Sequence, residues 1–167
     1  LTGICSEISS KIDYIKENND FENYLDYKHD VIHYFSMFDY RTIPDMVVPY
    51  FYTIPTKIWN SGKIPFLTWY PSTSTIEKTP NDICKKIYTG EFDHYLDRCC
   101  RSMKEYLAKA VASPIYGEPI LFLRFAHEMN IHYRLYAKTD EFIKMWHYIY
   151  NYLRNYGLKK DQVLFIF

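Results

Sequence analysis

Ile120-Leu121-Phe122-Leu123-Arg124-Phe125-Ala126-His127-Glu128-Met129-Asn130 is the stretch from which the fold can be inferred. It follows the turn signal Gly117-Glu118-Pro119, begins as a run of large apolar residues and ends in polar ones. A short apolar run after a turn is typical of a buried strand in a parallel sheet. Ligands of parallel α/β folds bind at the carboxyl ends of the strands. The candidate site residues of this stretch are therefore Arg124, His127, Glu128 and Asn130.

The rest of the chain alternates between expected strands and helices. Strands are expected at 1–5, 30–37, 64–69, from Ile120 onward and at 161–167, and helices at 6–18, 49–60, 89–110 and 139–156. This order predicts an α/β domain with a parallel sheet. The glycine-rich motifs of phosphate-binding α/β folds are absent from the sequence. A flavodoxin-like domain also has five alternating strands, but it would not explain the polar residues after the fourth strand.

Three segments resemble one family in the same order along the chain. Arg124-Phe125-Ala126-His127-Glu128-Met129-Asn130 resembles the acid/base motif of glycoside hydrolase family 26, the β-mannanase family. Thr68-Trp69-Tyr70-Pro71 is similar to its Thr-Trp-Glu-Pro signature, with Tyr70 in the acidic position, and 161–167 resembles its Asn-Val-x-Trp strand, with Phe165 in place of Trp. The resemblance implies a (β/α)8 TIM barrel.

The length of the chain bears on how much of a barrel it can form. A TIM barrel needs roughly 250 residues, whereas this chain has 167 and runs from Leu1 to the apolar end Val163-Leu164-Phe165-Ile166-Phe167. We therefore expect residues 1–167 to be the N-terminal part of a single barrel, with about the first five strands present and the C-terminal part missing.

The resemblance also implies roles for particular residues. Glu128 would be the general acid/base, His127 would contact the sugar at the cleavage site, and Arg124 could keep the nucleophile ionised. Further substrate-binding positions would be Asn130, Trp69 and Tyr133, the last in a segment that departs from the family's Gly-x-Trp-Tyr. The family's nucleophile is a glutamate at the end of the seventh strand, which these 167 residues do not reach. The chain alone is therefore predicted to be inactive, although the complete barrel would be a glycoside hydrolase.

In a second interpretation the chain has the same fold but no glycoside hydrolase activity. In it, the chain is a structural or glycan-binding module of an extracellular assembly. The residue at the seventh strand end would discriminate between the two, because a glutamate there favours the enzyme.

Composition limits the other classes of function. The 20 basic and 20 acidic residues leave no basic footprint for nucleic acid, and no segment approaches the roughly 20 apolar residues of a membrane span. The cysteines lack a Cys-x-x-Cys pair, and His127 and His132 are one residue too far apart for a His-Glu-x-x-His zinc motif, so no metal or cofactor is expected.

The expected partners are a β-mannan-like polysaccharide and other chains of an extracellular assembly, and the expected location is secreted. The disulfide pairing stays open.

Overall fold

The computed structural model describes residues 3–5, 14–38, 48–72, 79–131 and 139–167. Its strands are β1 (Gly3–Cys5), β2 (Val31–Met37), β3 (Ile64–Tyr70), β4 (Leu121–Phe125) and β5 (Val163–Phe165), and they form one sheet in the order β1-β2-β3-β4-β5. Every neighbouring pair is parallel. The predicted α/β class with a parallel sheet is confirmed.

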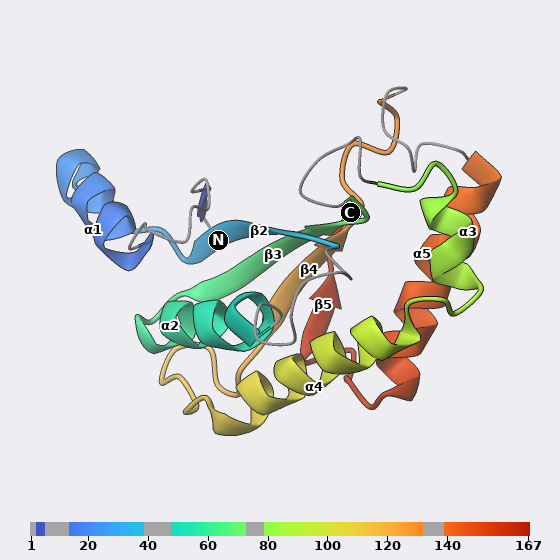
Figure 1. The fold of residues 1–167 in the computed structure, drawn as a ribbon. Helices are drawn as coiled ribbons and strands as arrows, with labels where there is room; N and C mark the ends of the chain where they lie inside the picture. The colour runs from blue at the N-terminus through green and yellow to red at the C-terminus, as the bar shows by residue number, and fades with distance from the viewer. Residues whose placement is uncertain (1–2, 6–13, 39–47, 73–78, 132–138) are drawn as a thin grey trace.

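The helices lie along one side of the sheet (Figure 1). They are α2 (Ile54–Asn60), α3 (Ile83–Tyr88), α4 (Asp93–Lys109) and α5 (Thr139–Asn155), while α1 (Tyr14–Leu25) lies apart, beyond the start of β2. Alternate strand residues such as Leu67 and Leu123 are fully buried on the helix side. Residues of the other parity, such as Phe66 and Phe122, are only partly buried. The sheet therefore has one face packed by helices and one face without a helix among the described residues.

Most of the predicted elements are present, with three differences. The predicted helix 49–60 is a π-helical turn, η2 (Pro49–Thr53), that continues as α2. Pro55 has no N–H to donate, and the wider turn before it relieves the clash that a proline causes inside an α-helix. The helix α3 was not predicted, because its six residues are too few to establish a helical period.

The third difference is the extent of the first helix. Its predicted end was Asn18, whereas α1 continues to Leu25, and residues 6–13 of the prediction lie outside the described residues. Asn18 and Glu22 are polar but buried, and Lys63 Nζ lies 2.5 Å from Glu22 Oε1. This long-range ion pair stabilises the second half of α1, where the polar sequence by itself predicts no helix.

Candidate functional site

The carboxyl ends of β2, β3 and β4 meet at one edge of the sheet. His127 follows β4 directly. The centre of its ring lies 5.1 Å from the ring centre of Tyr70 on β3 and 5.8 Å from that of Phe35 on β2, and both contacts are edge to face. The backbone N–H of Ala126 donates to the carbonyl of Trp69 at 2.9 Å, which extends the pairing of β3 and β4 by one residue. The polar residues that follow β4 are therefore held at the predicted end of the sheet.

The chain turns sharply after β4 through two residues in the left-handed region. Ala126 has φ 59° and Glu128 has φ 55°. This conformation costs roughly 1–3 kcal/mol for each non-glycine residue and is concentrated at functional sites. The turn directs the His127 side chain inward, where it is 13% exposed, and leaves the Glu128 side chain 45% exposed. Glu128 Oε2 then lies 3.6 Å from His127 Nε2.

A pocket of about 400 Å³ opens over this turn. Its polar lining residues are Arg124, His127, Glu128 and Asn130. Its apolar lining comes from the strand ends and from α5, and includes Phe35, Phe142, Trp146, Ile166 and Phe167. Four of the predicted site residues thus share one cavity with a broad apolar wall, which is the composition of a small-molecule site.

Arg124 enters this pocket from the face of the sheet without helices. Its Nε donates to Thr68 Oγ1 at 3.0 Å, and its guanidinium carbon lies 5.4 Å from the centre of the Phe66 ring. Thr68 Oγ1 is also 2.6 Å from His33 Nε2. Burial, followed by the charges of Arg124 and His127, lowers the pKa of His33 to about 4. Near neutral pH, Arg124 therefore lies beside a neutral imidazole.

We compared the chain with known proteins, and only solved structures matched it. A scan against protein-family models and a search of curated proteins found no match. Among solved structures, the Bacillus subtilis mannanase man26 is 17% identical with a TM-score of 0.66, covering 99% of this chain and 55% of that chain. The YdhT protein from Bacillus subtilis is 18% identical with a TM-score of 0.65, covering 99% and 55%. The GH26 β-mannanase from Bacteroides ovatus is 13% identical with a TM-score of 0.53, covering 82% and 43%.

The chain has a fold like that of the family 26 mannanases. At these identities the likeness is one of fold, and the chain spans about half the length of the solved structures that it matches. The family 26 mannanase-like fold agrees with the family suggested by the sequence motifs.

Trp69 occupies a different place in this fold from the one expected. Its side chain is fully buried on the helix side of β3, where it stacks on Phe38 at 5.4 Å and meets Phe51 and Phe125 edge to face. The neighbouring residues Thr68 and Tyr70 face the other side, because side chains alternate along a strand. In this arrangement Trp69 is a core residue and does not reach the pocket as a sugar platform.

The other predicted binding residues differ in what the structure describes. Asn130 is exposed at the rim of the pocket. Tyr133 lies outside the described residues. Cys84, Cys99 and Cys100 are buried free thiols, so none of these three forms a disulfide. The described residues contain no group of three or more His, Cys, Asp or Glu that could hold a metal ion. None of the described helices is long and apolar enough to cross a membrane.

The contribution of α5 to the pocket was not predicted from the sequence. Met145 is fully buried, whereas Phe142 and Trp146 are half-buried and line the cavity. The signal was present in the helix sequence, because Phe142, Trp146 and Tyr150 recur every four residues beside the core stripe of Met145 and Ile149. When a helix has two adjacent apolar stripes, one stripe can pack on the sheet while the second stripe lines a cavity.

Proposed function

We propose that this chain belongs to a retaining glycoside hydrolase that cleaves a β-mannan-like polysaccharide, with Glu128 as the general acid/base. The observation that carries the proposal is the position of Glu128, whose carboxyl group lies beside His127 in a pocket at the carboxyl end of a parallel sheet. The mannanase-like fold and the motif that ends in His127-Glu128-Met129-Asn130 support the same chemistry.

Glu128 would act twice in the reaction. In the first step its proton passes to the glycosidic oxygen, the bond to the leaving sugar breaks, and a carboxylate attacks the anomeric carbon. In the second step Glu128 takes a proton from water, the water oxygen bonds to the anomeric carbon, and the bond between that carbon and the carboxylate breaks, which releases the sugar. His127 would contact the sugar at the cleavage point, and Asn130 would hydrogen-bond the substrate at the rim.

The second carboxylate must lie about 5–5.5 Å from Glu128 for retention. Glu128 is the one carboxylic acid among the described residues that line the pocket. Asp93 begins α4, where its Oδ1 accepts the Tyr148 hydroxyl at 2.7 Å, and Asp39 lies outside the described residues. We place the nucleophile in barrel strands beyond these 167 residues, with Arg124 as the cation that keeps it ionised. The five strands would then be the first part of an eight-stranded barrel.

The test uses the native protein with Glu128→Ala and two kinds of substrate. On mannan, we expect kcat to fall by roughly 10²–10⁴-fold, because the leaving group is no longer protonated. On an aryl mannoside whose phenol leaves without protonation, the first step should proceed and the second should stall, giving a burst of phenol. Azide should then restore turnover by replacing the water that Glu128 activates, and the product should be a mannosyl azide with retained configuration.

Glu118→Gln is the matched control, because Glu118 is an exposed glutamate in the loop before β4. It should keep wild-type kinetics on both substrates. Equal activity of Glu128→Ala and wild type on mannan would refute the role of Glu128. A wild-type protein that binds manno-oligosaccharides without cleaving them would instead support the alternative, a glycan-binding module of an extracellular assembly. Secretion is part of the proposal, since the polysaccharide lies outside the cell.

A further inference from the structure

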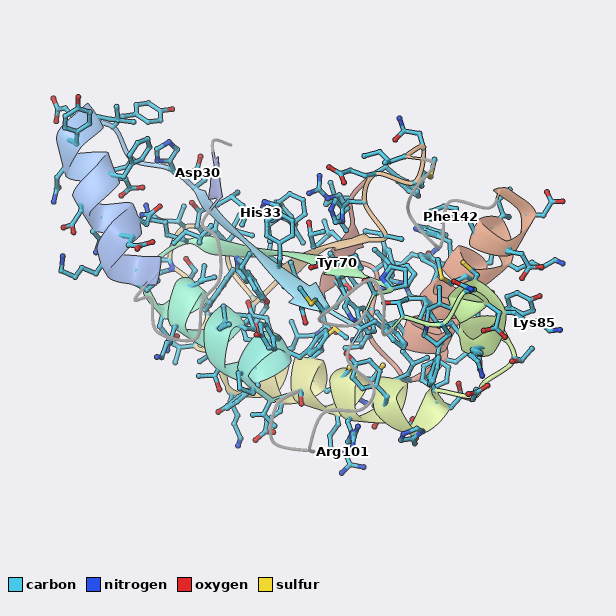
Figure 2. All side chains as sticks on the ribbon, turned by 45° about the horizontal axis from the view of Figure 1, so that its top comes forward. Asp30, His33, Tyr70, Lys85, Arg101 and Phe142 are labelled. Atoms are coloured by element: carbon cyan, nitrogen blue, oxygen red, sulfur yellow. The ribbon has the colours of Figure 1, made fainter. Side chains whose placement is uncertain are left out.

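Three polar side chains form a continuous hydrogen-bonded row across the helix-free face of the sheet. They are His33 on β2, Thr68 on β3 and Arg124 on β4, and Figure 2 labels His33 on the side of β2 away from α2. Thr68 pairs with Arg124 in the strand register and is fully buried. Its Oγ1 lies 2.6 Å from His33 Nε2 and 3.0 Å from Arg124 Nε. The threonine hydroxyl therefore links the other two side chains.

The chemistry of the three groups fixes the direction of this row. Arg124 Nε can only donate, so Thr68 Oγ1 accepts from it. The oxygen has a second lone pair and could also accept from a protonated His33 Nε2, but the hydrogen of this buried hydroxyl would then have no acceptor among the described residues. We therefore infer that the hydroxyl donates to an unprotonated His33 Nε2. This assigns the ring proton of His33 to Nδ1. A neutral His33 agrees with the pKa lowered to about 4 by burial and by the charges of Arg124 and His127.

The far end of the row lies in the pocket. Arg124 is held at two points, by Thr68 at its Nε and by the face of the Phe66 ring under its guanidinium carbon. It lines the same cavity as His127 and Glu128. A shift of the guanidinium would change the electrostatic field at a carboxyl group that must hold and release a proton.

We propose that Thr68 and His33 are positioning residues for Arg124, fixing the side-chain conformation in which its guanidinium faces the pocket beside Glu128. The catalytic consequence rests on the proposed glycoside hydrolase function, whereas the positioning itself does not. Neither Thr68 nor His33 touches the substrate in this proposal. They act through Arg124 alone.

The first experiment measures the row directly and needs no activity. Ring-nitrogen NMR of the native protein near neutral pH should show His33 with its proton on Nδ1, and the Arg124 Nε–H should exchange slowly with water. Thr68→Val removes the hydroxyl but keeps the shape of the side chain. It should move the His33 proton to Nε2 and speed the exchange of the Arg124 Nε–H. Thr68→Ser should restore both signals.

The second experiment measures catalysis on mannan. Thr68→Val should lower kcat roughly 10–100-fold with less effect on KM, because a displaced charge mainly affects the transition state. Thr68→Ser should recover most of this loss. Thr56→Val is the control, because the Thr56 hydroxyl donates to the Tyr52 carbonyl in the helix layer, away from the row. It should leave kcat unchanged.

The outcomes separate this inference from the proposed function. A wild-type His33 that carries its proton on Nε2, or a folded Thr68→Val that keeps slow Arg124 exchange, would overturn the positioning role. Wild-type kcat in a folded Thr68→Val with altered NMR signals would support the positioning of Arg124 but overturn its catalytic consequence, because the position of the guanidinium would then not affect the reaction. If the wild-type protein does not cleave mannan, the proposed function fails, and the NMR experiment alone decides whether Thr68 and His33 hold Arg124.

Discussion

His33 shows at the scale of a single residue how the tertiary environment changes a side chain's chemistry. Its ring lies 4.5 Å from Phe66 and 4.6 Å from Phe35. Burial among these rings, with the positive charges of Arg124 and His127, disfavours protonation. The sequence alone predicts that a histidine in the middle of a strand is an ordinary core residue. Its lowered pKa depends on neighbours that come from other strands.

The lowered pKa predicts a specific dependence of stability on pH. Folded His33 titrates near pH 4 and unfolded histidine near 6.5, so the unfolded chain binds more protons between these values. The contribution of neutral His33 is therefore fully present above pH 6.5 and declines as the pH falls toward 4. His33→Gln cannot be protonated. Urea unfolding at several pH values should show wild type losing stability relative to His33→Gln across this window, and parallel pH profiles would contradict the assignment.

The turn after β4 was predicted in position but not in conformation. The sequence placed His127 and Glu128 at the end of a strand, because an apolar run followed by polar residues is a local pattern. The left-handed conformations of Ala126 and Glu128 have no such local sign, since neither residue is a glycine. They are imposed by the pairing of Ala126 with β3 and by the packing of His127 against Tyr70 and Phe35.

At the scale of elements, the helix α1 is joined to the sheet by a buried ion pair. Lys63 Nζ lies 2.5 Å from Glu22 Oε1 and 2.6 Å from the His29 carbonyl oxygen. Burial alone would raise the pKa of Glu22, but the bonds from Lys63 and from the His29 N–H outweigh it and hold the pKa below its usual value. The stabilisation is therefore present above the pKa of unfolded glutamate and is lost as the pH falls through the lowered folded pKa.

Lys63→Met should destabilise the fold, because it leaves the buried carboxylate of Glu22 without its cation. We expect a loss of about 3–5 kcal/mol in the free energy of unfolding near neutral pH, measured by urea denaturation. Lys16→Met is the matched control, because its pair with Asp20 is exposed, and it should change stability by less than about 1 kcal/mol. Equal losses in the two variants would show that the buried pair has no special role in holding α1.

Trp69 lies in the layer between β3 and the helices. Its ring stacks on Phe38 and meets Phe51, Phe125 and Tyr95. Trp69→Ala should cost about 3–5 kcal/mol of stability, which is typical for removing a large buried ring. Met129→Ala, which truncates an exposed residue beside the pocket, should cost little. If Trp69→Ala keeps normal stability but binds manno-oligosaccharide weakly, Trp69 contacts the sugar and its assignment as a core residue is wrong.

At the scale of the whole molecule, the sheet has a helix-covered face and a helix-free face among the described residues (Figure 1). The pocket holds one described carboxylic acid, Glu128, whereas retaining hydrolysis needs two. If the nucleophile lies in strands beyond these 167 residues, as proposed, the 167-residue chain by itself is expected to release no reducing sugar from β-mannan. Sugar release that disappears in Glu128→Ala would contradict this expectation and place the nucleophile within the chain.

The sequence by itself determined the alternation of strands and helices, the parallel sheet and the polar cluster after β4. These features follow from hydrophobic periodicity and turn residues, which act over a few positions. Only the tertiary structure decided that Trp69 is core, that Phe142 and Trp146 line the pocket, and that Thr68 joins His33 to Arg124. The partners of Thr68 lie 35 and 56 residues away along the chain. Such contacts depend on the register of neighbouring strands and on which face each residue takes, and a local pattern specifies neither the partner strand nor the register.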